Sequence, residues 1–122
     1  MSPAAAALDP RLLHGIAEFN AGAFFEAHEV WEELWNDADG ETKRVVQALV
    51  QIAAGYHKLE LGVPGGAMKL FTRALGLLDD VRPAAAPLPL DDLRATVRRH
   101  LAQLHAAPVD RDLVPPRIAV PT

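Results

Sequence analysis

The chain has 122 residues, of which half are hydrophobic and 23% are charged, and its formal net charge is −4. This composition is typical of a single soluble globular domain and excludes a disordered chain. The acidic balance argues against a nucleic-acid partner, and no apolar run is long enough to span a membrane. Because cysteine is absent, disulfides and thiolate chemistry are excluded. Residues 1–7 are too short and uncharged for a signal peptide, so we expect a cytoplasmic protein.

Start and stop signals predict three helices in the first half of the chain. A first helix begins at the capping pair Asp9-Pro10 and ends at the turn residues 20–22. A second helix covers about residues 23–36 and is followed by a turn. The third helix covers about residues 41–61. It is apolar almost all the way round, which is typical of a central helix.

The second half predicts two more helices and a tail. A fourth helix covers about residues 64–81, and the linker 83–89, with three prolines, is expected to be stiff and extended. Apolar residues at helical spacing predict a fifth helix over residues 90–105. The proline-rich tail from Pro108 is expected to be extended. The tail side chains expected to dock on the bundle are Leu113, Val114, Ile118 and Val120.

The sequence also contains a weak internal repeat at a spacing of forty residues. The matched pairs include Gly15 and Gly55, Gly22 and Gly62, Ala27 and Ala67, and Trp31 and Phe71. Each copy predicts a helix, a glycine turn and a second helix, similar to the helical hairpin of tetratricopeptide arrays. The predicted fold is therefore all-α: a compact bundle of about five helices, built on two antiparallel hairpins, in a single domain spanning residues 1–122.

Residues 24–35 of the second helix carry the most informative side chains. A projection at 100° per residue places His28 beside Trp35 at the margin of an apolar arc that includes Trp31. The same projection places Glu32 inside the apolar sector, where we expect it to be semi-buried. The repeat replaces His28 by Met68 and Glu32 by Thr72. Hairpin packing alone would predict the same residues in both copies, so this difference favours a special role for the first copy.

The third helix supplies candidate partners for this pair. Gln47 and Gln51 lie on its narrow polar face, and His57 is embedded among aliphatic residues. An antiparallel hairpin sets the third helix against the second and could bring these side chains near His28 and Glu32, although the sequence does not fix the rotation of one helix against the other. The candidate ligand-binding residues are therefore His28, Glu32, Trp31, Trp35, Gln51 and His57. The two tryptophans also fit a core role, and His14, His100 and His105 are predicted to be surface residues.

The segment Phe19 to Trp35 resembles the signature of the domain-of-unknown-function 309 family, whose His-x-x-x-Glu-x-x-Trp motif is met by His28, Glu32 and Trp35. A second block of residues, including Gln51 and His57, also resembles that family. The resemblance covers about residues 11–78, which leaves residues 90–122 as an accessory helix and tail. It implies a compact helical fold and transfers no reaction.

Three interpretations of the His28/Glu32 pair stay open. The first is a module that binds a small ligand or a protein partner in a pocket around the pair. The second is a metal-dependent hydrolase in which Glu32 acts as general base and His28 and His57 hold a divalent metal. The third is a purely structural pair that orients the helix. The apolar content is also compatible with a homodimer.

Overall fold

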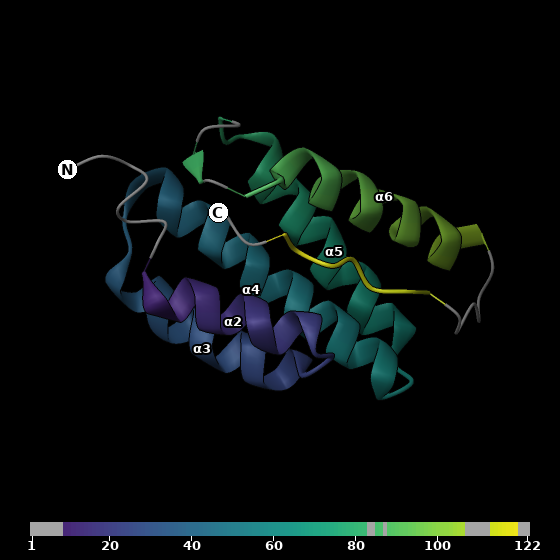
Figure 1. Ribbon diagram of the computed structural model, residues 1–122. Coiled ribbons are helices and arrows are strands. Elements are labelled where there is room, and N and C mark those ends of the chain that lie inside the picture. The colour runs from purple at the N-terminus through teal and green to yellow at the C-terminus, as the bar shows by residue number, and fades with distance from the viewer. Residues whose placement is uncertain (1–8, 83–84, 87, 107–112, 120–122) are drawn as a thin grey trace.

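The computed structural model describes residues 9–82, 85–86, 88–106 and 113–119. This part of the chain contains five helices and no strand, so the all-α prediction is confirmed (Figure 1). The helices are α2 (Pro10–Asn20), α3 (Phe24–Asp37), α4 (Gly40–Glu60), α5 (Pro64–Asp79) and α6 (Leu90–Ala106). Their bounds lie within about two residues of those predicted, which is the usual uncertainty of a helix end.

The first helix starts where the capping signal predicts. The Asp9 carboxylate accepts a hydrogen bond from the backbone N–H of Arg11 at 2.9 Å, as expected of an N-cap. The Arg11 side chain bonds the same carboxylate and therefore holds the pKa of Asp9 below its usual value. Arg11 also reaches Asp37 at the end of α3, at 2.6 Å. One arginine thus ties the start of α2 to the end of α3.

The predicted repeat is present in the backbone of the two turns. Gly22 and Gly62 both have positive φ, at 82° and 73°, which an L-residue with a side chain adopts only at a cost. The N–H of Ala23 donates to the carbonyl of Glu18 at 2.8 Å, and forty residues later Val63 donates to Lys58 at 2.9 Å. The α2–α3 and α4–α5 hairpins therefore turn in the same way, as the sequence repeat predicts.

Inside each hairpin, a glycine of the first helix faces an aromatic ring of the second. A β-carbon added at Gly15 would overlap the indole of Trp31, and one added at Gly55 would overlap the ring of Phe71. Both rings are fully buried. The absent side chains therefore allow the two helices of each hairpin to approach closely around one large ring, and the same device is used in both copies.

The central helix is α4, which packs against α3 on one side and α5 on the other. Its Tyr56 hydroxyl shares a 2.7 Å hydrogen bond with His100 Nδ1 of α6, and burial raises the pKa of Tyr56. His100 is only 3% exposed, so its predicted surface position is wrong. The helical spacing of α6 indicates which of its faces is apolar, but it does not reveal that a buried tyrosine hydroxyl lies opposite.

The linker and the tail both pack on the bundle. In the linker, Ala85, Ala86 and Leu88 are buried; residues 83, 84 and 87 lie outside the described part. In the tail, Ile118 is 2% exposed and Leu113 packs against the core, which confirms docking for those two residues. Val114 is largely exposed, so its predicted docking is wrong, and Val120 is outside the described residues. No helix in the described part is long and apolar enough to cross a membrane.

The glycine–aromatic contacts lead to a stability prediction. We expect Gly15→Ala and Gly55→Ala each to lower the free energy of unfolding by about 1–3 kcal/mol, because the added methyl group forces the ring or the helices apart. Gly76→Ala is the matched control, since its β-carbon meets nothing within 4 Å and alanine is the better helix former. Urea unfolding would measure all three. Equal stability of the Gly15 and Gly76 variants would contradict the packing argument.

Candidate functional site

Four residues of α3 form a stripe along one side of the helix. Phe25, His28, Glu32 and Trp35 are spaced three, four and three residues apart, so their side chains lie one above the other. His28 Nε2 lies 3.2 Å from Glu32 Oε2. The i and i+4 pairing predicted from the sequence is therefore formed, although the function of the pair is a separate question.

The predicted burial of Glu32 is wrong. Its side chain is 56% exposed, whereas that of His28 is 26% exposed. The helical projection places Glu32 in the apolar sector, but this stripe runs along the edge of α3, where a long side chain reaches solvent. An ion pair with one solvent-exposed member contributes little to stability. The half-buried member of the pair is the histidine.

Trp31 belongs to the core. Its ring is fully buried, and its Nε1–H donates to the backbone carbonyl of Leu12 at 3.2 Å. The indole is therefore satisfied inside the α2–α3 hairpin and does not face a surface site, contrary to its place among the candidate ligand-binding residues. The alternative core role that the sequence allowed is the one observed.

Contacts at both ends of the stripe show how α4 lies beside it. The rings of Phe25 and His57 are 5.5 Å apart between centroids, and Lys43 Nζ lies 4.3 Å from the centre of a Trp35 ring. The two helices are thus antiparallel along this edge. With a rise of about 1.5 Å per residue, His28 and Gln51 lie within about 2–5 Å of the same level along the helix axes. Trp35 lies about 10 Å farther along.

Three buried polar atoms, two on the α3 stripe and one on α4, have no hydrogen-bond partner among the described residues. They are Nδ1 of His28, Nε1 of Trp35 and Oε1 of Gln51, and all three are buried. A buried polar atom without a partner costs about 1–3 kcal/mol, and such atoms are rare in folded proteins. In the part of the chain that the structure describes, the unsatisfied buried side-chain atoms all belong to candidate residues named from the sequence.

The three-ligand metal centre is not formed. His57 Nδ1 lies 3.7 Å from Glu60 of its own helix. Among the described residues, no group of three or more His, Asp or Glu side chains could hold a metal ion. Within the described residues, His28 and Glu32 are therefore a pair without the third protein ligand that a catalytic zinc site requires.

Phe25 is not among the candidate ligand-binding residues predicted from the sequence. This ring is 48% exposed, and it lies beside the rings of both His28 and His57. Its spacing from His28 and Glu32 was a usable signal, because residues three and seven apart share a helix face. An exposed aromatic ring between two partly buried imidazoles is a feature of binding surfaces more than of a solvated helix face.

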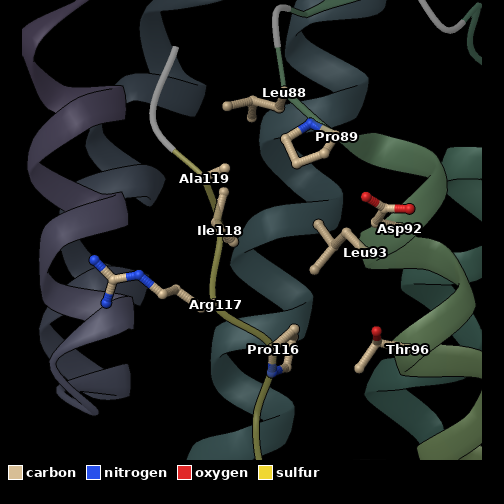
Figure 2. A pocket seen from close by; sticks show the side chains of 9 residues that line it. All are labelled: Leu88, Pro89, Asp92, Leu93, Thr96, Pro116, Arg117, Ile118 and Ala119. Carbon is tan, nitrogen blue, oxygen red and sulfur yellow. The ribbon is translucent and has the colours of Figure 1, made fainter. Parts of the chain in front are cut away.

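A cavity lies elsewhere in the molecule. It has a volume of about 220 Å³ and is bounded by residues 88–96 at the start of α6 and by residues 116–119 of the tail (Figure 2). None of the candidate residues on α3 or α4 lines it. The ligand pocket expected around His28 and Glu32 and this cavity are therefore separate features.

The fold defines a small protein of two helical hairpins, and the α3–α4 edge carries His28 and Trp35 beside His57 and Lys43. The family described as domain of unknown function (DUF309) matches residues 12–70, which include every candidate residue on α3 and α4. The resemblance to this family is thus confirmed over that range, which ends eight residues before the predicted limit. No curated protein matches the chain.

A double substitution tests whether the His28/Glu32 pair is structural. We expect His28→Met with Glu32→Thr to leave the free energy of unfolding unchanged or to raise it by up to about 1 kcal/mol, because Glu32 is exposed and the change removes the unsatisfied Nδ1 of His28. The second hairpin has Met68 and Thr72 at the equivalent positions. Thermal unfolding followed by circular dichroism would measure it. A large loss of stability would instead identify the pair as a structural element.

A second substitution tests the unsatisfied amide. We expect Gln51→Met to raise the free energy of unfolding by about 1 kcal/mol, because it removes a buried oxygen that has no partner while keeping the side-chain volume. Gln47→Met, on the same helix, is the matched control, since neither polar atom of Gln47 is among the unsatisfied buried ones. A clear loss of stability for Gln51→Met alone would mean that the oxygen is already satisfied, for example by a buried water molecule.

Proposed function

We propose that this protein is a binding module that recognises an elongated polar ligand along the α3–α4 edge. The observation that carries the proposal is the set of three buried polar atoms without partners, on His28, Trp35 and Gln51. Proteins keep such atoms against their cost in stability mainly at functional sites.

The chemistry of the three atoms constrains the ligand. The indole Nε1–H of Trp35 is a donor only, and the amide oxygen of Gln51 is an acceptor only. The imidazole Nδ1 of His28 serves as either, according to its tautomer. A matching ligand therefore offers an acceptor toward Trp35 and a donor toward Gln51. Because the levels of Trp35 and Gln51 are between about 6 and 12 Å apart along the helices, a ligand with two separated polar groups fits better than a single ion.

Phe25 and Glu32 would form the outer part of this site. Glu32 is exposed beside His28, and it adds one negative charge at that end of the edge. Phe25 offers an apolar face, and exposed side chains change rotamer within nanoseconds. The Phe25 ring lies 6.3 Å from the His28 ring between centroids, so movement of Phe25 would change access to that imidazole. The charge favours a donor group on the ligand that carries a positive charge.

The two tryptophans allow a direct test by nuclear magnetic resonance. A ¹⁵N-labelled sample gives two indole N–H signals, because the chain has two tryptophans, and Trp35→Phe would assign them. We expect millimolar dipeptides, which carry a carboxylate acceptor and an ammonium donor, to shift the Trp35 signal. Dicarboxylates and diamines, which each lack one of these groups, are comparison probes and should shift it less. The Trp31 signal is the internal control, because its N–H already donates to Leu12 and should not move.

Two outcomes would contradict this proposal. If every probe leaves the Trp35 signal unchanged, or shifts both indoles equally, the edge is not a specific binding site. If protein purified without a metal-affinity step contains stoichiometric zinc or manganese that is lost in His28→Ala, the hydrolase interpretation replaces it. Loss of the probe-induced shift in Gln51→Met, with the fold intact, would support the binding module.

A further inference from the structure

The side chain of Asn20 holds the C-terminal segment 113–119 through hydrogen bonds to its backbone. Figures 1 and 2 show this segment between α2 and α6, in front of α4. Asn20 Nδ2 donates to the carbonyl of Ile118, and the N–H of Ile118 donates to Asn20 Oδ1, both at 2.8 Å. An amide that satisfies both backbone groups of one residue recognises a non-helical chain whatever its sequence.

The segment also anchors one side chain in the bundle. Ile118 is 2% exposed and belongs to the core, whereas its neighbours Arg117 and Ala119 are exposed. Recognition of a peptide commonly combines such main-chain bonds, which supply affinity, with pockets for individual side chains, which supply specificity. We call the place of segment 113–119, beside Asn20 of α2 and Leu93 of α6, the α2–α6 groove. It contains both elements, and the protein's own chain fills them.

A second side-chain position in the groove is unfilled. The cavity of about 220 Å³ lies between residues 116–119 and the α6 side, where Pro89 and Leu93 supply apolar walls (Figure 2). Ala119 is next to the anchored Ile118 and lines this cavity with a single methyl group. The groove thus offers more room beside Ile118 than the chain's own segment uses.

The polar residues of this cavity indicate which side chain would fit. Asp92 and Thr96 line it from α6, one helical turn apart. Asp92 forms no ion pair with any described residue, and Figure 2 shows the guanidinium of Arg117 directed away from the cavity, toward α2. Apolar walls that lead to a carboxylate without an ion pair in the described part of the chain match a long side chain with a positive end.

We propose that the α2–α6 groove binds extended peptide segments of a partner protein, and that residues 113–119 occupy it in the free protein. The preferred segment carries an aliphatic residue at the place of Ile118 and a lysine or arginine at the place of Ala119. The protein's own residues 113–119 then compete with the partner for the groove, at a high local concentration because they belong to the same chain. This site is separate from the α3–α4 edge and does not depend on the function proposed there.

The first test keeps the segment within the chain. We expect Ala119→Lys to raise the melting temperature by about 1–4 °C, the scale of one favourable ion pair, and Asp92→Asn to remove that gain. Ala119→Glu is the matched control, because it places a negative charge beside Asp92 and should lower the melting temperature. Equal effects of lysine and glutamate at this position would overturn the preference for a basic side chain.

The second test supplies the segment from outside. In the full-length variant Ile118→Ser the native anchor is lost, and circular dichroism would check that the helices remain. We expect this variant to bind a fluorescein-labelled peptide Leu-Val-Pro-Pro-Arg-Ile-Lys about threefold or more tighter than the same peptide ending in Ile-Ala. Fluorescence anisotropy would measure both affinities. The unaltered protein should bind each peptide more weakly, because its own segment competes.

Asn20→Ala, added to the Ile118→Ser variant, is the control for the backbone clamp and should weaken binding of both peptides. A folded Ile118→Ser variant that binds neither peptide would overturn the proposal. If that variant does not fold, the comparison of Ala119→Lys with Ala119→Glu still decides the side-chain preference. Binding of the labelled peptide to the unaltered protein, in competition with the native segment, still decides whether the groove is open to a partner.

Discussion

The bundle depends on a close approach between two helices, made possible by a glycine opposite a buried ring. Gly15 accommodates Trp31 in the first hairpin, and Gly55 accommodates Phe71 in the second. In each contact an aromatic ring from the partner helix occupies the space that a side chain on the glycine would need. Because the same contact recurs forty residues later, the chain folds as two copies of one unit with α4 between α3 and α5.

This packing explains why the polar residues of α3 and α4 lie where they do. Trp31 and Ala27 fill the interior of the first hairpin, so the helix stripe that carries His28 and Trp35 lies at the edge of the α3–α4 contact. Side chains at such an edge are half-buried, which removes their polar atoms from water without supplying partners. The second hairpin has Met68 and Thr72 at the positions equivalent to His28 and Glu32, and it carries no comparable edge in the described residues.

The C-terminal part completes the bundle in a different way. The helix α6 packs on α5 and reaches α4 through the Tyr56–His100 hydrogen bond, and the segment 113–119 then closes the gap between α2 and α6 (Figure 1). The match to the DUF309 family ends at residue 70, before these elements. The part matched by the family therefore carries the His28/Glu32/Trp35 motif on α3 and also Asn20 of α2, which holds the C-terminal segment that lies outside the match.

Most of the architecture followed from local signals in the sequence. The capping pair Asp9-Pro10, the turn glycines Gly22 and Gly62 and the apolar periodicity predicted the helices to within about two residues, because these signals act over one or two turns. The forty-residue repeat likewise predicted two hairpins of equal design, since it aligned each glycine with its counterpart and each ring with its counterpart.

The exposure of individual side chains was decided only by the tertiary structure. Periodicity gives the direction in which a side chain leaves its helix, but not what lies opposite. Glu32 was thus predicted to be semi-buried and is exposed, whereas His100 was predicted to be exposed and is buried against Tyr56. The clamp between Asn20 and Ile118 joins residues 98 positions apart, and no local pattern marks it. The sequence determined the helices and the two hairpins. Packing of one helix against another decided which polar groups are buried without a partner, because burial depends on the neighbour and not on the residue alone.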